Sequence, residues 1–337
     1  MSKENEVCCV LPTNQKNETS PVSKEIAKDG RFVRQTNQFT TPFGEEEGSL
    51  PIEKNRYRLI WAPVCPWAHR QVIVRKILGL EEVISLGTLD PLRPTDIGKI
   101  DWAFTLDEGN IDPVLKVQYL SELYKNADPE YSGRPTVPAV IDLQTKKVVQ
   151  NDYHNLTYYW EREWKKFHKK DAPDLFPVEK EKEIRELNEI IFHEINNGVY
   201  KAGFAQSQEA YEAAYELVFN RLDWLEERLS KQRFLHGDKI TDSDVRLYVT
   251  LARFDTAYYA AFNVNKKRLI DYPNLWGYAR DLYQTDGFGN TTDFDGIKKH
   301  YFLSLHILEK ESKPKILPKG PDLSIWKTPH NRATQFA

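Results

Sequence analysis

The chain has 337 residues, and its 47 lysines and arginines against 50 aspartates and glutamates give a formal net charge of −3. At about 150 residues per domain, this length predicts two domains. The near-neutral charge excludes the strongly basic surface that is typical of nucleic-acid-binding proteins. The one dense basic cluster, which we interpret as a solvent-exposed face, consists of Lys165, Lys166, Lys169 and Lys170.

The sequence shows no pattern of a membrane span, a secretory signal or a metal site. No apolar run approaches the roughly 20 residues that cross a bilayer, and the polar start of the chain leads into no apolar segment. We therefore expect a cytoplasmic protein that does not bind membranes. Three cysteines are too few for a disulfide framework, and the eight histidines are scattered at spacings that predict no metal ligands. Cys8 and Cys9 are adjacent in a polar leader, whereas Cys65 lies where regular structure is expected.

The first elements follow a polar extension. Residues 1–50 are rich in turn-forming residues, with one compact apolar and basic island at residues 30–34, and we expect them to lie over the surface of a domain. Side chains alternate from residue 56 to residue 61, which predicts a strand. A second strand is predicted over residues 83–86.

The segment between these two strands has the periodicity of a helix. Its apolar residues recur at helical spacing, and they are Val72, Ile73, Ile77 and Leu80. Arg70, Arg75 and Lys76 fall outside this apolar stripe, and Gly79 marks the end of the helix. Two strands with a helical crossover between them form a β-α-β unit.

Further elements complete a first domain. We predict a helix over residues 114–124, strands over residues 137–141 and 147–150, and a helix over residues 152–167. The resulting order, β-α-β-α-β-β-α, is typical of a thioredoxin-like α/β domain. Cys65 lies at its first strand-to-helix junction, which strengthens this interpretation.

The remainder of the chain is predicted to be helical. Residues 171–177 are interpreted as a linker, and residues 241–244 as a structural helix cap. A proline-rich segment over residues 314–329 is expected to form an extended tail. Three apolar stripes at helical spacing lie between the linker and the tail. They consist of Ile184, Leu187, Ile191 and Ile195; of Tyr215, Val218, Leu222, Leu225 and Leu229; and of Val245, Leu247, Val249, Leu251 and Phe254.

Cys65 opens the first predicted helix, within the segment VCPWAHR over residues 64–70. Unpaired backbone N–H groups and the positive end of the helix dipole favour a thiolate there and lower the thiol pKa. Ala68 stands where a CxxC motif has its second cysteine, so an external thiol has to resolve any mixed disulfide formed on Cys65. A glutathione-type co-substrate is implied, and the alternative is a buried, inert cysteine.

The neighbours of Cys65 give less specific signals. His69 falls on the same helical face and can assist deprotonation, although we favour a surface or capping role. Arg70 can either steer anions or be solvated. The Val137-Pro138 bond opens a predicted strand opposite Cys65, and a cis bond there leaves the Val137 backbone free to pair with an extended peptide such as glutathione. The alternative is an ordinary edge-strand proline.

Residues 64–70 resemble the active-site motif of the glutathionyl-hydroquinone reductases, the Xi class of glutathione transferases. Similarity to that family spans residues 30–330, and its motifs are specific in combination. The further similar segments are residues 30–34 (GRFVR), 196–205 (NNGVYKAGFA), 253–255 (RFD) with Tyr258, 271–276 (DYPNLW), 297–301 (IKKHY) and 320–321 (GP).

This resemblance implies the glutathione transferase fold, in which an α/β thioredoxin-like N-terminal domain precedes an all-α C-terminal domain. The implied parts are an extension over residues 1–50, a glutathione-binding domain over 51–168, a helical domain over 178–310 and a tail over 311–337. A homodimer is also implied. The implied reaction converts a glutathionyl-hydroquinone and glutathione into hydroquinone and oxidised glutathione through a mixed disulfide on Cys65.

By the same resemblance, the family holds glutathione at the positions of Trp102, Arg134, Val137 and Pro138. An indole can cover the tripeptide, a guanidinium can pair with a carboxylate, and a backbone can make strand-like hydrogen bonds.

Three tyrosines, Tyr200, Tyr258 and Tyr301, match those that line the aromatic substrate pocket of the family. Their phenols can stack on a quinol ring or hydrogen-bond to its hydroxyl groups. Any one of them alone is more often a core tyrosine.

The chain departs from the family at one place. Where the family has Glu-Ser at the start of the last thioredoxin-domain helix, this chain has Asn151-Asp152. Asp152 can still accept a hydrogen bond from the ammonium of glutathione, and its backbone N–H can meet a carboxylate. The change predicts a different thiol or a weakened site.

Two alternative functions stay open. A glutathione-dependent dehydroascorbate or thiol-disulfide reductase would use the same Cys65 and differ only in its substrate pocket. A binding or regulatory protein that keeps the transferase fold without turnover is the second alternative, and Asn151-Asp152 motivates it.

Overall fold

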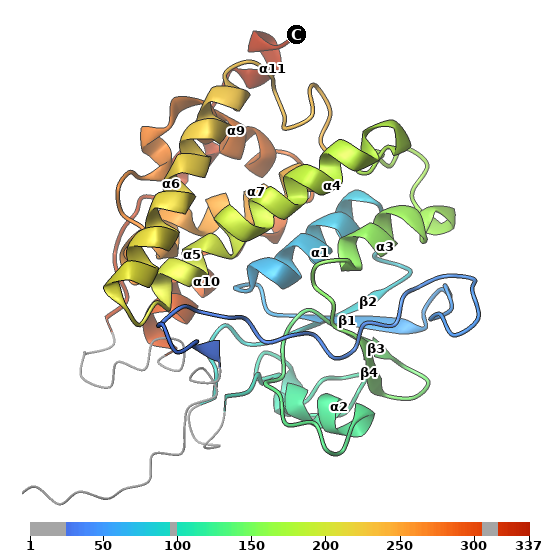
Figure 1. Ribbon diagram of the computed structural model, residues 1–337. Coiled ribbons are helices and arrows are strands. Elements are labelled where there is room, and N and C mark those ends of the chain that lie inside the picture. The colour runs from blue at the N-terminus through green and yellow to red at the C-terminus, as the bar shows by residue number, and fades with distance from the viewer. Residues whose placement is uncertain (1–24, 95–99, 305–315) are drawn as a thin grey trace, which may run out of the picture.

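The computed structural model describes residues 25–94, 100–304 and 316–337 (Figure 1). The chain folds into a half that contains a sheet and a half that consists of helices. The expectations for Cys8, Cys9 and the first 24 residues of the extension lie outside the described residues. So do those for residues 305–315, where the predicted helical domain meets the predicted tail.

The first half is built on a four-stranded mixed sheet of order β2-β1-β3-β4. Strand β1 is parallel to β2 and antiparallel to β3, and β3 is antiparallel to β4. The strands are β1 (Tyr57–Trp61), β2 (Ser85–Thr88), β3 (Ala139–Asp142) and β4 (Lys147–Gln150). Helices α1 (Pro66–Ile77) and α3 (Leu156–Arg162) cover one face, and α2 (Leu120–Ala127) covers the other (Figure 1). The predicted element order and thioredoxin-like architecture are confirmed.

Two helices in this half begin later than predicted, because aspartate side chains fix the turns before them. The Asp112 carboxylate accepts hydrogen bonds from the amides of Val114 and Leu115, which keeps this segment out of α2. The Asp152 carboxylate accepts one from the His154 amide at 3.0 Å and so holds a turn before α3. Such side-chain bonds offer the backbone an alternative to a helix that apolar periodicity does not register.

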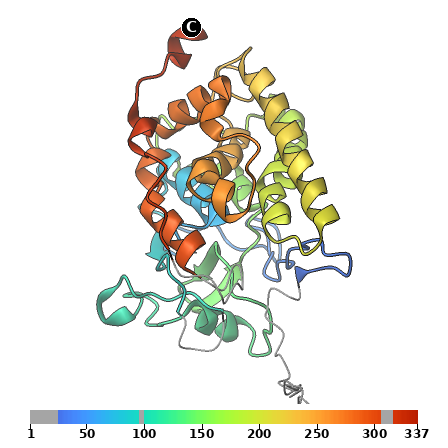
Figure 2. The ribbon, with the colours of Figure 1, turned by 90° about the vertical axis from the view of Figure 1, so that its left-hand side faces the viewer.

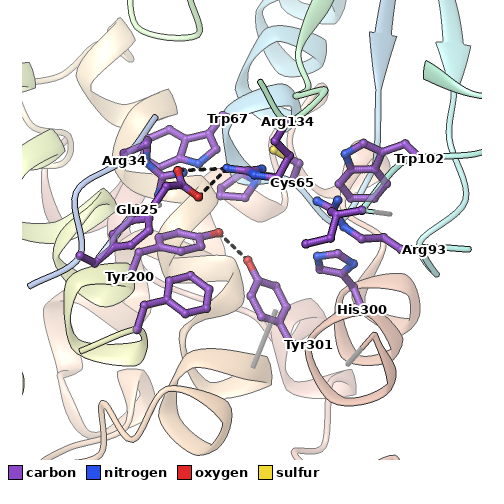
Figure 3. A pocket seen from close by; sticks show the side chains of 14 residues that line it. Glu25, Arg34, Cys65, Trp67, Arg93, Trp102, Arg134, Tyr200, His300 and Tyr301 are labelled. Atoms are coloured by element: carbon purple, nitrogen blue, oxygen red, sulfur yellow. Dashed lines mark hydrogen bonds and ion pairs between the residues drawn. The ribbon is translucent and has the colours of Figure 1, made fainter. Parts of the chain in front are cut away.

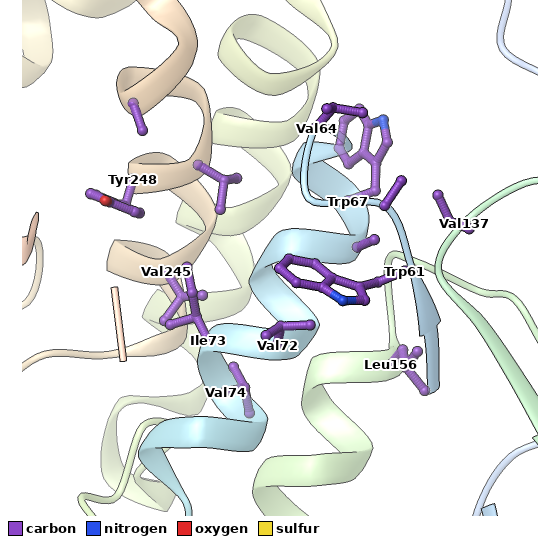
Figure 4. Close-up of a cluster of buried hydrophobic side chains, with 14 of the residues drawn as sticks. Trp61, Val64, Trp67, Val72, Ile73, Val74, Val137, Leu156, Val245 and Tyr248 are labelled. Carbon is purple, nitrogen blue, oxygen red and sulfur yellow. The ribbon is translucent and has the colours of Figure 1, made fainter. Parts of the chain in front are cut away.

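Helix α1 has almost no solvent-exposed face, because it lies between the sheet and α7 (Asp242–Arg253) of the helical half (Figure 4). Arg70 is fully buried, and its guanidinium donates to the Tyr153 carbonyl. Arg75 is also buried, and its Nε donates to the Ile84 carbonyl at 2.7 Å. Carbonyl groups therefore accept some of the hydrogen bonds that these side chains would otherwise donate to water. The solvated role considered for Arg70 was wrong.

The second half is helical, as predicted, and Figure 2 shows it above the sheet. Its helices are α4 (Glu181–Ile190), α5 (Gly198–Gly203), α6 (Gln208–Leu229), α7, α8 (Tyr259–Ala261), α9 (Pro273–Tyr283) and α10 (Phe294–Leu303). Turns of π-helix follow α4 (Ile191–Asn196) and α7 (Phe254–Tyr258). The three apolar stripes lie on α4 with its π-turn, on α6 and on α7, and they are buried except for the half-buried Tyr215. The predicted cap of α7 is confirmed, since Asp244 accepts from the Thr241 amide at 2.8 Å.

The extension crosses from the helical half to the sheet (Figure 1). Its Phe32 ring is buried, with its centroid 5.2 Å from that of Phe204. Further along, the Phe39 carbonyl accepts from the Asn151 amide at 2.7 Å beside the sheet. The expected position over a domain surface is confirmed, and the segment also connects the two halves.

The end of the chain packs on the helical half and is not the extended tail that was expected. It forms a 3₁₀ turn at Ser324–Lys327 and a short helix, α11 (Arg332–Gln335). Trp326 is buried, and the buried Arg332 donates to the carbonyls of Gln232 and Arg233 at 2.6 and 2.7 Å.

The exposed basic cluster over residues 165–170 is confirmed. In the part of the chain that the structure describes, no helix has the length and apolar character of a membrane span. The residue limits of the domains stay a prediction.

Burial of α1 from both sides predicts a large effect of truncating its apolar face. Ile73 is fully buried, so Ile73→Ala should lower the free energy of unfolding by about 2–5 kcal/mol, measured by urea denaturation. The matched control is Val178→Ala at a residue that is 66% exposed, which should change it by less than about 0.5 kcal/mol. Equal effects of the two variants would contradict this packing.

Candidate active site

Cys65 caps the N-terminus of α1 and lines a cavity between the two halves (Figure 3). Its amide donates to the Ala62 carbonyl at 2.9 Å, and its own carbonyl accepts from the His69 amide at 2.9 Å. Pro66 occupies the first position of the helix, where a missing N–H leaves no hydrogen bond unmade. The backbone thus fixes the thiol at the start of the helix, as the sequence predicted.

The cavity brings together residues predicted for two different ligands. The predicted residues that line it are Cys65, Trp102, Arg134, Tyr200 and Tyr301. A smaller adjoining cavity shares the thiol and adds Thr136, Val137 and Tyr153. Groups suited to a peptide and groups suited to an aromatic ring therefore lie around the same sulfur atom.

The surroundings of Cys65 raise its pKa above the ordinary value. Burial is the largest cause, and it outweighs the backbone N–H groups of Ala68 and Trp67 and the positive charges of Arg253 and Arg34, which lower the pKa. The Sγ atom lies 3.4 Å from the Val137 carbonyl oxygen, to which a protonated thiol donates. The predicted lowering of the thiol pKa was therefore wrong, because the half-buried Cys65 loses more hydration to its surroundings than the helix N-terminus replaces.

The Val137-Pro138 peptide bond is cis, as the sequence predicted. Val137 faces the adjoining cavity, and its carbonyl accepts from Cys65. Its amide donates to no group in the described ranges of the chain. One strand-like donor is therefore available to a bound peptide.

Arg134 is already paired with a carboxylate of the chain itself. Its Nη2 atom lies 3.1 Å from Oε2 of Glu25 and 3.2 Å from Oε1 (Figure 3). Glu25 is 6% exposed and also accepts from the Gln35 amide at 2.7 Å, while the Gln35 side chain accepts from the Arg134 amide at 2.9 Å. Sequence reasoning missed Glu25, because nothing in the polar leader distinguishes it from the other glutamates.

Arg34 of the extension also reaches the cavity. Its guanidinium carbon lies 4.8 Å from the ring centroids of both Trp67 and Tyr200, within the range of cation–π attraction. Its Nε donates to the Asn197 side chain at 3.1 Å. The sequence offered a signal here, since Arg34 ends the apolar and basic island at residues 30–34, but no role was assigned to it.

Arg93 and His300 lie on Trp102. The Arg93 guanidinium carbon is 4.0 Å from the Trp102 ring centroid, and the His300 ring stacks on the indole at 5.3 Å. Burial, followed by the charge of Arg93, lowers the pKa of His300 to about 3, so this imidazole is neutral. Both residues were missed. Arg93 lies in a loop that shows no periodicity or motif. His300 lies in the segment 297–301, which was noted only as similar to the family.

Asn151 and Asp152, predicted to hold glutathione, line neither cavity. The buried Asn151 accepts from the Phe39 amide at 3.1 Å and so fixes the extension. The Asp152 carboxylate accepts from the Asn155 side chain at 2.7 Å. Tyr153 is the residue of this segment that reaches the adjoining cavity.

The three predicted tyrosines form one buried cluster of hydroxyl groups (Figure 3 shows two of them). The hydroxyl oxygens of Tyr200 and Tyr301 are 2.6 Å apart, and Tyr258 lies 3.4 Å from the first and 3.3 Å from the second. Burial raises the pKa of all three phenols, so they are neutral donors at neutral pH. Tyr200 and Tyr301 face the cavity, and Tyr258 supports them from behind.

His69 is fully buried, so the surface role favoured for it was wrong. Its Nε2 lies 2.9 Å from the Thr291 hydroxyl, and its Nδ1 lies 3.2 Å from the Arg253 guanidinium. Burial and the charge of Arg253 lower its pKa well below the ordinary range. It does not line the cavity.

In the described ranges, no group of three or more metal-ligating side chains was found.

Comparison with known proteins places this site in a family. The chain is 38% identical over 314 residues to glutathionyl-hydroquinone reductase YqjG of Escherichia coli (strain K12), covering 91% of this chain and 94% of that protein. The chain belongs to the glutathionyl-hydroquinone reductase family. Residues 208–281 of the chain also match the family model of the glutathione S-transferase C-terminal domain.

Solved structures agree with this family and its fold. A Xi class glutathione transferase from Natrialba magadii has a TM-score of 0.80 at 35% identity, covering 88% of this chain and 89% of that one. The glutathione-bound structure of YqjG from Escherichia coli K-12 has a TM-score of 0.79 at 39% identity, and the match covers 87% of this chain and 92% of that one. The chain is therefore an enzyme of the glutathione transferase superfamily, with a thioredoxin-like domain followed by a helical one.

The environment of Cys65 predicts an unusual pH dependence. In a Cys8→Ala/Cys9→Ala background, Cys65 is the one thiol of the chain, and its rate of alkylation by iodoacetamide can be followed against pH. Because burial raises the pKa, the thiolate forms only at higher pH, and the rate should rise with an inflection above the ordinary value of 9.0. An inflection below that value would mean that the helix N-terminus and the arginines outweigh burial.

Proposed function

We propose that the chain removes the glutathionyl group from glutathionyl-hydroquinones, with Cys65 as the nucleophile and glutathione as the second substrate. One observation carries the proposal: the Cys65 thiol lines a single cavity together with Trp102 and Arg134 of the sheet half and with Tyr200 and Tyr301 of the helical half. A peptide and an aromatic ring joined through sulfur would fit these two sides at once. The same thiol without the phenols would suit only a general disulfide reductase.

In the first step, the Cys65 thiolate attacks the thioether sulfur of the substrate. A sulfur–sulfur bond forms to Cys65, and the bond between sulfur and the aromatic carbon breaks. The electron pair passes to that carbon, which takes up a proton and leaves as hydroquinone. Because one of the paired hydroxyl groups of Tyr200 and Tyr301 donates to the other, the remaining O–H would donate to a quinol oxygen, which supports this orientation.

In the second step, the thiolate of another glutathione attacks the mixed disulfide. Oxidised glutathione leaves, and Cys65 returns as a thiolate. Ala68, in place of a second cysteine, supports this dependence on an external thiol. The atoms balance as one glutathionyl-hydroquinone and one glutathione giving hydroquinone and oxidised glutathione.

Glutathione itself would be held by groups on the sheet side of the cavity. The Val137 amide can donate a hydrogen bond to the glutathione backbone, and the Trp102 indole can pack against the peptide. The Arg134 guanidinium can pair with one of its carboxylates. Asn151 and Asp152 would support this side indirectly, by holding the extension and the turn before α3. Reduced glutathione is abundant in the cytoplasm, so we propose a cytoplasmic enzyme. We also propose a homodimer, from the resemblance to the family.

Turnover of glutathionyl-menadione with glutathione tests this proposal. Cys65→Ala should lower the rate of menadiol release by at least about a thousandfold, because the nucleophile is lost. The matched control, Cys8→Ala/Cys9→Ala, should keep the rate of the parent chain. Mass spectrometry of a stopped reaction should find one glutathione on Cys65. Release of menadiol that does not depend on Cys65 would overturn the proposal, and binding without turnover would favour a binding protein.

The pair of Arg134 and Glu25 predicts competition with the ligand. Glu25→Gln removes an internal carboxylate that occupies Arg134, so the dissociation constant for glutathione should fall by about threefold to tenfold in calorimetric titration. Glu53→Gln is a matched control, because Glu53 pairs with Arg56 away from the cavity. Weaker binding by Glu25→Gln would show that this carboxylate holds the ligand ammonium instead.

A further inference from the structure

Arg253, the last residue of α7, links the helical half to the loop that precedes Cys65. Its Nη2 donates to the Pro63 carbonyl at 2.8 Å, and its Nε donates to the Val64 carbonyl at 2.9 Å. Its Nη1 donates to the Val249 carbonyl at 2.7 Å within α7. One guanidinium thus fixes the two residues directly before Cys65 against the helical half.

The same guanidinium fixes the state of His69. Its Nη1 lies 3.2 Å from Nδ1 of His69, so Nδ1 has to accept and the ring proton lies on Nε2. That proton is donated to the Thr291 hydroxyl at 2.9 Å, and the hydroxyl in turn donates to the Gly287 carbonyl at 2.8 Å. His69 is therefore a neutral partner that adds no negative charge beside Arg253.

Arg253 is fully buried, and no carboxylate in the described part of the chain forms an ion pair with it. The titratable groups that experience its charge include Cys65 before α1, His69 on α1, Tyr248 on α7, Tyr258 after α7, and His300 and Tyr301 on α10. The phenols and imidazoles among them are neutral at neutral pH. Backbone carbonyls accept from this buried guanidinium, but no anion in the described ranges neutralises it, so its positive charge is felt by the groups around it.

Cys65 is the one group among these that becomes an anion in the proposed reaction. We propose that Arg253 is a positioning residue, which holds residues 63–64 in front of the nucleophile and, together with Arg34 of the extension, supplies positive charge that balances the Cys65 thiolate. This inference rests on the proposed role of Cys65. The charge acts twice: it favours the attacking thiolate in the first step, and it stabilises the thiolate that leaves when glutathione resolves the mixed disulfide.

Alkylation of Cys65 tests this role without turnover. In the Cys8→Ala/Cys9→Ala background, Arg253→Met should move the inflection of the iodoacetamide rate to higher pH by about one unit, so that the rate below the inflection falls about tenfold. Arg253→Lys, which keeps a positive charge, should recover most of the shift. An unchanged inflection in a folded Arg253→Met protein, with the thermal midpoint checked by circular dichroism, would overturn the proposal.

A matched variant separates charge from stability. Arg246 is also buried on α7, but it pairs with Asp242 at 2.5 Å and lies two helical turns from Arg253. Arg246→Met should lower the thermal midpoint and leave the inflection of Cys65 in place. A shift equal to that of Arg253→Met would mean that loosening of α7 moves the inflection, and this result would overturn the proposal.

The parent chain provides a test that needs no variant at Arg253. Salt screens exposed charges strongly and buried charges weakly. The inflection of Cys65 should therefore stay constant between low and high potassium chloride concentrations. An inflection that rises with salt would assign the stabilising charge to exposed groups and overturn the proposal. Because alkylation needs neither glutathione nor a quinol, these results stand even if the proposed turnover is not found.

Discussion

Desolvation of one sulfur atom is the constraint on which the rest of this site depends. A cysteine at the start of an exposed helix would have its charge stabilised by water and by the backbone N–H groups together. Here the helical half covers α1, so the half-buried thiol loses part of its hydration and the N–H groups do not compensate for that loss. Positive charges around Cys65 offset part of that loss. They are carried by Arg34 of the extension, Arg93 after β2, Arg134 before β3 and Arg253 at the end of α7.

The two sides of the cavity follow from the two architectures that meet there. A sheet edge and the loops around it present backbone groups and arginines, which suit an extended peptide. Packed helices present side chains only, and the helical half places aromatic rings with hydrogen-bonding hydroxyl groups at the same sulfur. A site that joins a peptide to an aromatic ring therefore needs both halves of the chain in contact.

The sequence predicted elements and motifs well and environments poorly. The order of strands and helices, the position of Cys65 and the cis bond before Pro138 follow from local patterns, and all were confirmed. Periodicity does not record what covers the second face of a helix, so a surface or capping role was favoured for His69 and a solvated role was left open for Arg70, although both are buried. Glu25 and Arg93 carry no local signal, because their partners are brought close only by the fold.

The walls of the cavity also come from opposite ends of the chain. Arg34 stands near its beginning, whereas His300 and Tyr301 stand near its end, and both groups face the same sulfur. During synthesis at the ribosome, the sheet and Cys65 emerge long before α10 does. A nascent chain at that stage lacks His300 and Tyr301, so the cavity around the thiol is completed only when α10 has docked. The chemical surroundings of Cys65 are therefore among the last features of the chain to form.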